Sequence, residues 1–322
     1  MKLYRYYAAA VLALSVFSAI ESRAAGTYEP SGTYLFASKD GQDLFLDVYD
    51  PAEGSTTEID GIGKPTVIFL FGGGFTAGIR NWAGNQEWFR MLNNAGYRVV
   101  AIDYRLGLKG SHKAGVNAKF VKSLDKAIHM AVEDLFSATN FIIDNARELG
   151  IDPESLVVSG SSAGAISALQ AEWEICNGTD IAAALPEGFN YAGTMSFSGA
   201  IFSRKGSLRY SRMSPCPTMM CHGTADKIVP YHKLQFLKII FGGTDAISKV
   251  FVRNAYNYNI FRFKGNGHEI ANNMIHDFDR EMEFLENNVM KKERRIIDIE
   301  ISDPSIEVPE WAAKNSPKEL YD

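Results

Sequence analysis

The chain has 322 residues, of which 46% are hydrophobic and 22% charged, and it carries a net charge of −5. This is the composition of an ordinary globular protein, with enough apolar side chains for one large domain or two small ones. The acidic balance does not indicate binding to nucleic acid or to acidic membranes.

The first 24 residues have the pattern of a secretory signal peptide. Lys2 and Arg5 precede an uncharged stretch over residues 8–20, and Ser22 and Ala24 then give the small-x-small pattern of a cleavage site. The apolar stretch is short for a membrane span, and an uncleaved N-terminal anchor is the alternative. We expect a periplasmic or secreted protein with no stable membrane insertion after signal cleavage.

Three strands and a glycine run are predicted next. Residues 33–36 and 44–49 are β-prone, and Asp40-Gly41 between them suits a hairpin turn. Residues 66–71 form a continuous apolar run, as expected for a strand buried on both faces of a parallel sheet. Three glycines, residues 72–74, follow this run directly.

Helices and strands then alternate along the chain. Helices are predicted over residues 86–94, 117–148 (with one break) and 273–291, and strands over residues 98–103, 191–197, 217–222 and 259–263. This alternation indicates an α/β fold with a mainly parallel central sheet, helices on both faces and antiparallel first strands. The two longest connections, residues 177–190 and 231–258, are expected to be lids, pocket walls or plain surface excursions.

A nucleophile elbow lies in the middle of the chain. Residues 156–158 form a short apolar strand, and Ile166, Leu169 and Trp173 have the spacing of a helix face. Between them stands Gly160-Ser161-Ser162-Ala163-Gly164, the pattern G-x-S-x-G. The pattern alone recurs by chance, and its position between a strand and a helix makes it specific. Ser162 is therefore the candidate nucleophile.

Two later loops carry the other candidate residues of a catalytic triad. A serine hydroxyl is a weak nucleophile at neutral pH and needs a base within hydrogen-bonding reach, which a carboxylate orients. Asp226 follows the predicted strand 217–222 and His268 follows the predicted strand 259–263, so both lie at the sheet edge where Ser162 emerges. The order Ser162, Asp226, His268 is the order that this kind of site requires.

Asp226 and His268 each have a plainer interpretation. Asp226 fits a turn or helix-cap aspartate, and His268 between small residues fits an exposed loop histidine. Both would have to coincide in the right order and in the right loops, which favours the triad. The other histidines fit less well, and among them His222 is expected to shape the loop that holds Asp226.

The oxyanion of an acyl-transfer intermediate needs fixed N–H donors about 3 Å away. Candidates are the amides of Ala163, which follows the nucleophile, and of Gly73 and Gly74, which have no side chain in the way. The plainer interpretation of the glycine run is a flexible turn. In a phosphate-binding loop the glycines would be followed by Lys-Ser/Thr, which this chain lacks there.

Three cysteines, Cys176, Cys216 and Cys221, allow at most one internal disulfide. Cys216 and Cys221 are expected to be too far apart to pair, because five extended residues span about 16 Å. Free or structural thiols are the expectation. No metal-ligand spacing such as C-x-x-C is present, so no metal site is predicted.

Five motifs in order give a resemblance to a known family. They are Phe71-Gly72-Gly73-Gly74-Phe75, Asp103-Tyr104-Arg105, Gly160-Ser161-Ser162-Ala163-Gly164, His222-Gly223-Thr224-Ala225-Asp226 and Gly267-His268. With these motifs the chain resembles the α/β-hydrolase superfamily, and more narrowly the carboxylesterases and the hormone-sensitive-lipase-like esterases, over roughly residues 43–291. Phe71 departs from the hormone-sensitive-lipase-like pattern, which has His there. Asp103-Tyr104-Arg105 is expected to support the oxyanion loop.

The resemblance implies a serine esterase that acts through an acyl-enzyme and needs no cofactor. Its catalytic domain is expected over residues 25–292, and residues 293–322 form a tail of unknown role. Phe75 and Trp82 are candidates for a substrate-binding wall, although aromatic side chains near a core are more often simply core. The substrate is expected to be a small-molecule or carbohydrate ester, with acetyl or feruloyl groups on plant polysaccharide as the hypothesis. A serine peptidase of the same fold and an inactive esterase-like binding protein are the alternatives.

Overall fold

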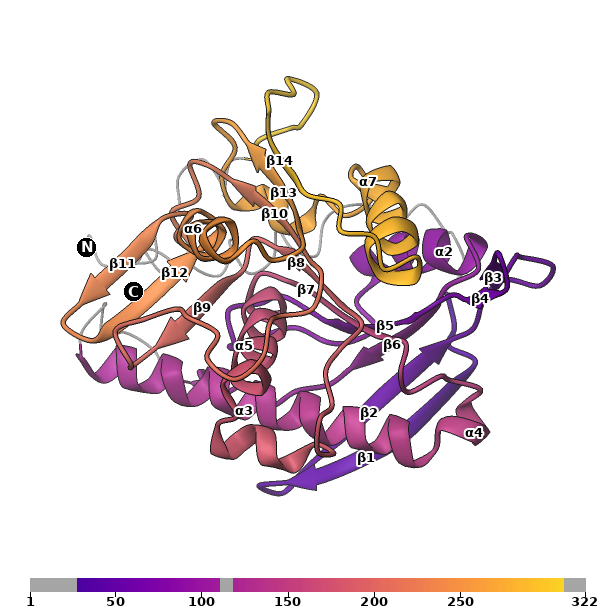
Figure 1. Cartoon of the computed structure of the whole chain (residues 1–322). Coiled ribbons are helices and arrows are strands. Elements are labelled where there is room, and N and C mark those ends of the chain that lie inside the picture. Colours follow the sequence, from indigo (N-terminus) through magenta and orange to yellow (C-terminus); the bar gives the residue numbers. More distant parts are fainter. Residues whose placement is uncertain (1–27, 111–117, 310–322) are drawn as a thin grey trace, which may run out of the picture.

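The computed structural model describes residues 28–110 and 118–309 (Figure 1). The predicted signal peptide lies outside the described residues. A nine-stranded sheet runs through the molecule in the order β1-β2-β6-β5-β7-β8-β10-β13-β14. Its strands are β1 (Gly32–Lys39), β2 (Gln42–Tyr49), β5 (Thr66–Leu70), β6 (Arg98–Ile102), β7 (Leu156–Ser161), β8 (Gly193–Phe197), β10 (Thr218–Gly223), β13 (Tyr258–Phe263) and β14 (Ile297–Ile301).

The sheet is mixed in the way the sequence predicts. β1 and β2 form an antiparallel hairpin, and β2 also pairs antiparallel with β6. The turn residues Asp40 and Gly41 have φ values of 52° and 76°, as a tight two-residue hairpin turn requires. From β6 to β14 every neighbouring pair is parallel. A short separate hairpin consists of β3 (Glu58–Ile59) and β4 (Ile62–Gly63).

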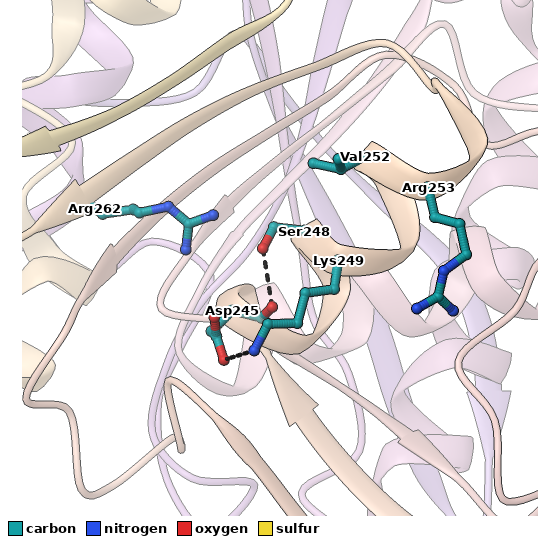
Figure 2. Close-up of a pocket in the computed structure, with 6 residues that line it drawn as sticks. All are labelled: Asp245, Ser248, Lys249, Val252, Arg253 and Arg262. Atoms are coloured by element: carbon teal, nitrogen blue, oxygen red, sulfur yellow. Dashed lines mark hydrogen bonds and ion pairs between the residues drawn. The ribbon is translucent and has the colours of Figure 1, made fainter.

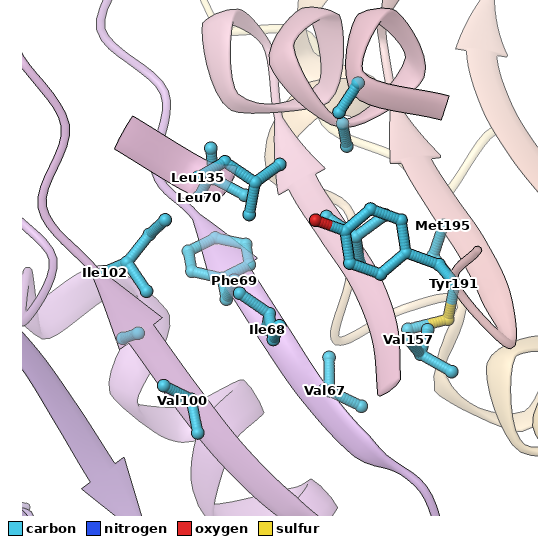
Figure 3. Close-up of a cluster of buried hydrophobic side chains, with 14 of the residues drawn as sticks. Val67, Ile68, Phe69, Leu70, Val100, Ile102, Leu135, Val157, Tyr191 and Met195 are labelled. Atoms are coloured by element: carbon cyan, nitrogen blue, oxygen red, sulfur yellow. The ribbon is translucent and has the colours of Figure 1, made fainter. Parts of the chain in front are cut away.

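The main core lies around the parallel strands. Val67, Ile68, Phe69 and Leu70 of β5 are 0% exposed, because this central strand has helices over both faces. Figure 3 shows these side chains beside Val100 and Ile102 of β6 and Val157 of β7, which fill the neighbouring positions. Packing of this density fixes the height at which each strand ends, and the loops at those ends carry the candidate site.

Two groups of helices cover the sheet. On one face are α3 (Ala118–Asp144), α4 (Ala146–Leu149), α5 (Ala163–Asn177) and α6 (Thr244–Asn254), and on the other α2 (Ala83–Asn94) and α7 (Phe278–Glu283) (Figure 1). α5 and α6 share a hydrophobic cluster that includes Trp173 and Phe251. Across the sheet, the buried Trp88 of α2 donates a hydrogen bond to Glu281 of α7 at 2.7 Å. The predicted break in the long helical region falls at Asn145, between α3 and α4.

The two long connections contain structure that the sequence did not predict. Residues 177–190 include a 3-10 turn, η2 (Asp180–Ala184). Residues 231–258 contain β11 (Lys233–Phe236), β12 (Ile239–Gly243) and α6. β12 pairs with β11 on one side and with β9 (Ala200–Ser203) on the other, which makes a small three-stranded sheet. This connection is therefore a folded part of the domain and not an irregular surface loop.

The last part of the chain corrects two predictions. A continuous helix over residues 273–291 was expected, but η3 (His268–Asn272) and a turn precede α7, and η4 (Phe284–Met290) continues it as a π-helix. Residues 293–322 were expected to form a tail with a strand-like alternation over residues 295–301, and this alternation is β14, which pairs with β13 along five residue pairs and forms the edge of the central sheet. The folded domain therefore extends beyond residue 292.

Candidate active site

The strand β7 ends in a strained turn at Ser162. This residue has φ 52° and ψ −114°, a left-handed conformation that a non-glycine side chain rarely adopts. The turn is held because α5 packs directly on the sheet: a Cβ placed on Gly164 would lie 2.0 Å from the carbonyl oxygen of Leu70. A Cβ on Gly160 would meet the backbone of Gly164 at 2.3 Å. The elbow therefore requires both glycines, and Ser162 lies at the tip of the turn, directly before the first residue of α5.

The three residues predicted for a triad lie in one hydrogen-bonded chain. Ser162 Oγ is 2.8 Å from His268 Nε2, and His268 Nδ1 is 2.8 Å from Asp226 Oδ2. A carboxylate oxygen only accepts, so Nδ1 carries the hydrogen and Nε2 of the neutral ring accepts the Ser162 hydroxyl. The arrangement has the geometry in which an imidazole removes a proton from a serine hydroxyl.

Asp226 is buried but remains ionised. Its Oδ1 accepts hydrogen bonds from the amides of Ile228 and Val229, at 2.8 and 3.0 Å. Burial disfavours the charged carboxyl, but hydrogen bonds from His222 and His268 outweigh it and hold the pKa of Asp226 well below its usual range. A carboxylate that is always charged stabilises an imidazolium when the base takes up a proton.

His222 approaches the same carboxylate oxygen of Asp226 as His268 does. It is fully buried, and its Nε2 lies 3.2 Å from Asp226 Oδ2 and 3.1 Å from the carbonyl oxygen of Val229. Both partners are acceptors, so Nε2 carries a hydrogen. Nδ1 lies 2.9 Å from the hydroxyl of Thr244. His222 was expected only to shape the loop that holds Asp226. In the structure its ring also contacts the Asp226 carboxylate itself.

The loops that carry Asp226 and His268 are tied to each other. Ala225 donates its amide to the carbonyl of Asn266 at 2.8 Å, and Gly265 donates to the hydroxyl of Thr224 at 2.9 Å. Glu269 closes the second loop, since its Oε1 accepts from the amide of Gly267 at 2.7 Å. These bonds set the base and its carboxylate as one unit.

The glycine run lies against the nucleophile. A Cβ on Gly72 would be 3.3 Å from Cβ of Ser162, and the φ angles of Gly73 and Gly74 are 122° and 62°. Within the described part of the chain, the amides of Gly73, Gly74 and Ala163 donate no hydrogen bond. They are thus available to an oxyanion at Ser162.

Side chains from the loop after β6 hold this oxyanion loop. Tyr104 donates its hydroxyl to the carbonyl oxygen of Phe71 at 2.7 Å and stacks on the Phe71 ring at 4.4 Å. Arg80, at the far end of the loop, forms ion pairs with Asp47 and Asp103, each at 2.8 Å. The support predicted for Asp103-Tyr104-Arg105 is therefore provided by Asp103 and Tyr104.

Solved structures with a similar overall fold decide the fold of this chain. The native form of Thermogutta terrifontis esterase 2 superposes with a TM-score of 0.55, over 80% of this chain and 94% of that chain, at 20% sequence identity. The same esterase phosphoramylated by tabun gives a TM-score of 0.54, over 79% and 95%, at 21% identity. The chain has the α/β-hydrolase fold.

Sequence comparisons agree with the predicted resemblance to α/β-hydrolase esterases. The BD-FAE family model matches residues 46–174. Fumonisin B1 esterase of Sphingopyxis macrogoltabida is 29% identical over 45% of this chain, and liver carboxylesterase B-1 of Rattus norvegicus is 31% identical over 38%. The matched regions are only 23% and 20% of those two proteins. The resemblance is confirmed, and these esterases are longer proteins, of which this chain matches about a fifth.

The two candidates for a substrate wall lie in different environments. Phe75 is 1% exposed, with its ring edge-on to Tyr104 at 6.2 Å between centroids. Its assignment to substrate binding is wrong, because the positive φ of 60° turns the side chain into the core below the oxyanion loop. Trp82 is 36% exposed at the start of α2, with its ring against Gly84, and its role stays a prediction.

The linings of two surface cavities contain none of the three triad residues. One of about 400 Å³ is lined by Asp245, Ser248, Lys249, Val252, Arg253 and Arg262, between α6 and β13 (Figure 2). Lys249 donates to Asp245 there at 2.8 Å, which neutralises part of the cavity. No cluster of three metal-ligating side chains is found in residues 28–110 and 118–309.

The three cysteines are buried free thiols in the structure. Burial, together with the nearby carboxylate of Glu172, raises the pKa of Cys176 and of Cys216 far above the usual value. Such thiols stay protonated and are poor nucleophiles. Ser162 therefore stays the candidate nucleophile, as its hydrogen bond to His268 supports.

Proposed function

We propose that this protein is a serine carboxylic-ester hydrolase that works through an acyl-enzyme. The observation that supports this most directly is the continuous chain from Ser162 Oγ through His268 to Asp226, with both distances at 2.8 Å. The free amides beside Ser162 supply the second requirement of acyl transfer, and the named relatives that match the chain are esterases.

In the proposed cycle, Ser162 Oγ bonds to the acyl carbon while its proton moves to Nε2 of His268. The tetrahedral oxyanion accepts hydrogen bonds from Gly73, Gly74 and Ala163, and it collapses when the alcohol leaves with the proton from His268. Water then attacks the acyl-enzyme by the reverse sequence and gives the free acid. Asp226 keeps its negative charge throughout and stabilises the imidazolium.

The turnover of a short-chain aryl ester tests this proposal. Ser162→Ala is expected to lower kcat by on the order of 10⁶, because no other group can replace the hydroxyl. Ser167→Ala is the matched control, since that hydroxyl lies one turn further along α5 and donates only to the carbonyl of Ala163. Full activity of Ser162→Ala would reject the mechanism. Faster turnover of an aminoacyl amide than of the ester would favour a peptidase instead.

For the substrate, we propose an acetyl or feruloyl ester on plant polysaccharide. The export pattern of residues 1–24 supports an enzyme that works on material outside the cytoplasm, and the match to the BD-FAE family model supports an ester as its substrate. Release of acetate from acetylated xylan, of ferulate from a feruloylated oligosaccharide and of acid from simple alkyl esters should be compared by kcat/KM. Preference for the alkyl esters would reject this substrate class and leave the hydrolase proposal intact.

For the location, we propose the periplasm or the medium. Lys2, Arg5, the uncharged stretch of residues 8–20 and the small residues before residue 25 support this proposal. N-terminal sequencing of the protein from its natural host is expected to give a chain that begins at or near Ala25. A chain that starts at Met1 and remains in the cytoplasmic fraction would contradict it.

A further inference from the structure

The hairpin formed by β11 and β12 exposes three large apolar side chains. Leu234, Phe236 and Leu237 are 58%, 74% and 79% exposed, and we call these three residues the hairpin tip. The hairpin projects from the side of the molecule opposite to the β3–β4 hairpin (Figure 1). A single exposed apolar side chain is ordinary, but three together at the end of a projecting hairpin are typical of an interaction surface.

The turn at the tip is conformationally costly. Leu237 is the first residue of the two-residue turn between β11 and β12, and its φ is 52°. This position of such a turn favours glycine, which adopts positive φ without steric strain. A bulky leucine in its place keeps an apolar side chain at the outermost point of the hairpin. Strain of this kind is a reason to look for a function.

The surroundings of the tip are basic, although the whole chain has a net charge of −5. Residues 200–244 contain seven Lys and Arg, and their single acidic residue is Asp226 of the triad. Lys233 and Lys238 flank the tip itself, and the backbone bond from Gly206 to Lys238 brings Arg204 and Lys205 beside it. Of these, Arg204 pairs with Asp125 of α3, whereas the side chain of Lys205 lies over the Trp173 ring.

We propose that the hairpin docks this protein on the surface of an anionic lipid bilayer. Leu234, Phe236 and Leu237 would enter the boundary between headgroups and acyl chains, while Lys233 and Lys238 would contact the anionic headgroups. A bilayer of this kind offers an apolar layer directly beneath a negative one, and the hairpin has the complementary order. The net charge of the chain does not exclude such binding, because Lys233 and Lys238 flank the tip and residues 227–244 contain no Asp or Glu.

A second copy of the chain fits the hairpin less well. Two hairpins packed together would bring their lysines into proximity, and like charges repel. Three side chains also offer only a few hundred Å², whereas a stable interface buries roughly 800 Å² per partner. The proposal depends on the hairpin alone and holds or fails independently of the ester hydrolase proposal.

Vesicle co-sedimentation tests the docking. The intact protein is mixed with vesicles of phosphatidylglycerol and phosphatidylcholine in equal parts, or of phosphatidylcholine alone. The triple variant Leu234→Ser, Phe236→Ser, Leu237→Asn is expected to partition at least about tenfold less onto the anionic vesicles. Lys233→Gln and Lys238→Gln should each cost roughly fivefold, and only at low salt. Ile62→Ser, on the acidic β3–β4 hairpin, is the matched control and should change nothing.

A local probe shows which part of the chain meets the bilayer. The native cysteines are buried, so Leu237→Cys can be labelled selectively with an environment-sensitive fluorophore, with Ile62→Cys as control. The label at residue 237 should shift to the blue with anionic vesicles, and the label at residue 62 should not. An unshifted label at residue 237, or unchanged partitioning of the triple variant, would overturn the proposal. Light scattering that shows a dimer abolished by the triple variant would assign the hairpin to a second copy instead.

Discussion

Asp226 Oδ2 lies within hydrogen-bonding distance of two imidazoles, at 2.8 Å from His268 Nδ1 and 3.2 Å from His222 Nε2. The first ring is the base of the proposed reaction, and the second never reaches the substrate because it is fully buried. The hydrogen on His222 Nε2 disperses the charge of the Asp226 carboxylate and fixes the rotamer of that side chain, so His222 acts as a positioning residue.

The first prediction follows from this arrangement. His222→Phe removes the donor while keeping a ring of similar size, so more negative charge stays on Asp226 and the protonated form of the base is favoured. The acidic limb of the kcat/KM profile is expected to move to higher pH by roughly 0.5 unit or more. His222→Gln is the control, because its amide can place an N–H near the position of Nε2 and should restore the profile. Identical profiles for all three proteins would contradict a positioning role.

The candidate triad residues could be predicted from the sequence because each lies in, or next to, a local sequence pattern. Ser162 lies in a motif whose strand and helix can be recognised, and Asp226 and His268 follow strands in the required order. Phe75 was wrongly assigned because its direction depends on a positive φ that the sequence does not reveal. The contact between His222 and Asp226 was missed in part because it depends on the height at which β10 ends.

Among the elements, the turn between β7 and α5 is the most tightly constrained. A Cβ at Gly164 would lie 2.0 Å from the carbonyl oxygen of Leu70, which is backbone and cannot rotate away. Gly164→Ala is therefore expected to lower the free energy of unfolding by about 3 kcal/mol, as overpacking does, and to lower kcat by displacing Ser162.

Chemical unfolding and ester turnover measure these two effects. Gly63→Ala is the control, since a Cβ there has no atom within 4 Å and should leave both quantities unchanged. A Gly164→Ala protein as stable and as active as its parent would show that α5 does not press on β5 as described.

The predicted elements were most accurate where apolar patterns face a core. β5, β6, β7 and α5 have such patterns and lie where the sequence placed them. β11 was missed because its alternation of polar and apolar residues spans only four positions, Lys233–Phe236, and all four residues are exposed. The helix expected over residues 273–291 is interrupted because Asp277 is drawn into the interior, where it accepts from Arg280 and from Asn273.

At the scale of the whole molecule, the edge strand β14 completes the sheet. Arg262 of β13 donates to Asp298 of β14 at 2.6 and 2.9 Å, and the two strands pair along five residues. A chain that ends at Lys292 is expected to lose about 2–5 kcal/mol of unfolding free energy, because several backbone hydrogen bonds and the ion pair are removed. Urea unfolding checks this, and an unchanged midpoint would restore the boundary predicted from the sequence.

A buried carboxyl makes the stability depend on pH. Glu281 of α7 is 0% exposed and lies against Trp88 of α2. Burial raises its pKa well above the usual value. The folded state then binds this proton more tightly than the unfolded state, whose pKa is about 4.3. The free energy of unfolding should therefore fall as pH rises above that value, by at most about 1.4 kcal/mol per unit.

Glu281→Gln tests this dependence, since an amide keeps the acceptor for Trp88 and does not titrate. Urea unfolding at pH 5 and at pH 8 is expected to give a smaller difference for the variant than for the parent. Equal differences would mean that Glu281 does not titrate between the two states.

The central claim is that loops from three distant parts of the chain make Ser162 a reactive nucleophile. Intact-mass spectrometry after treatment with a fluorophosphonate ester measures this directly. We expect one phosphonyl adduct per chain, mapped to Ser162, absent in Ser162→Ala and formed far more slowly in His268→Ala. An adduct that persists in Ser162→Ala, or a parent protein that takes up no label while folded, would contradict the account.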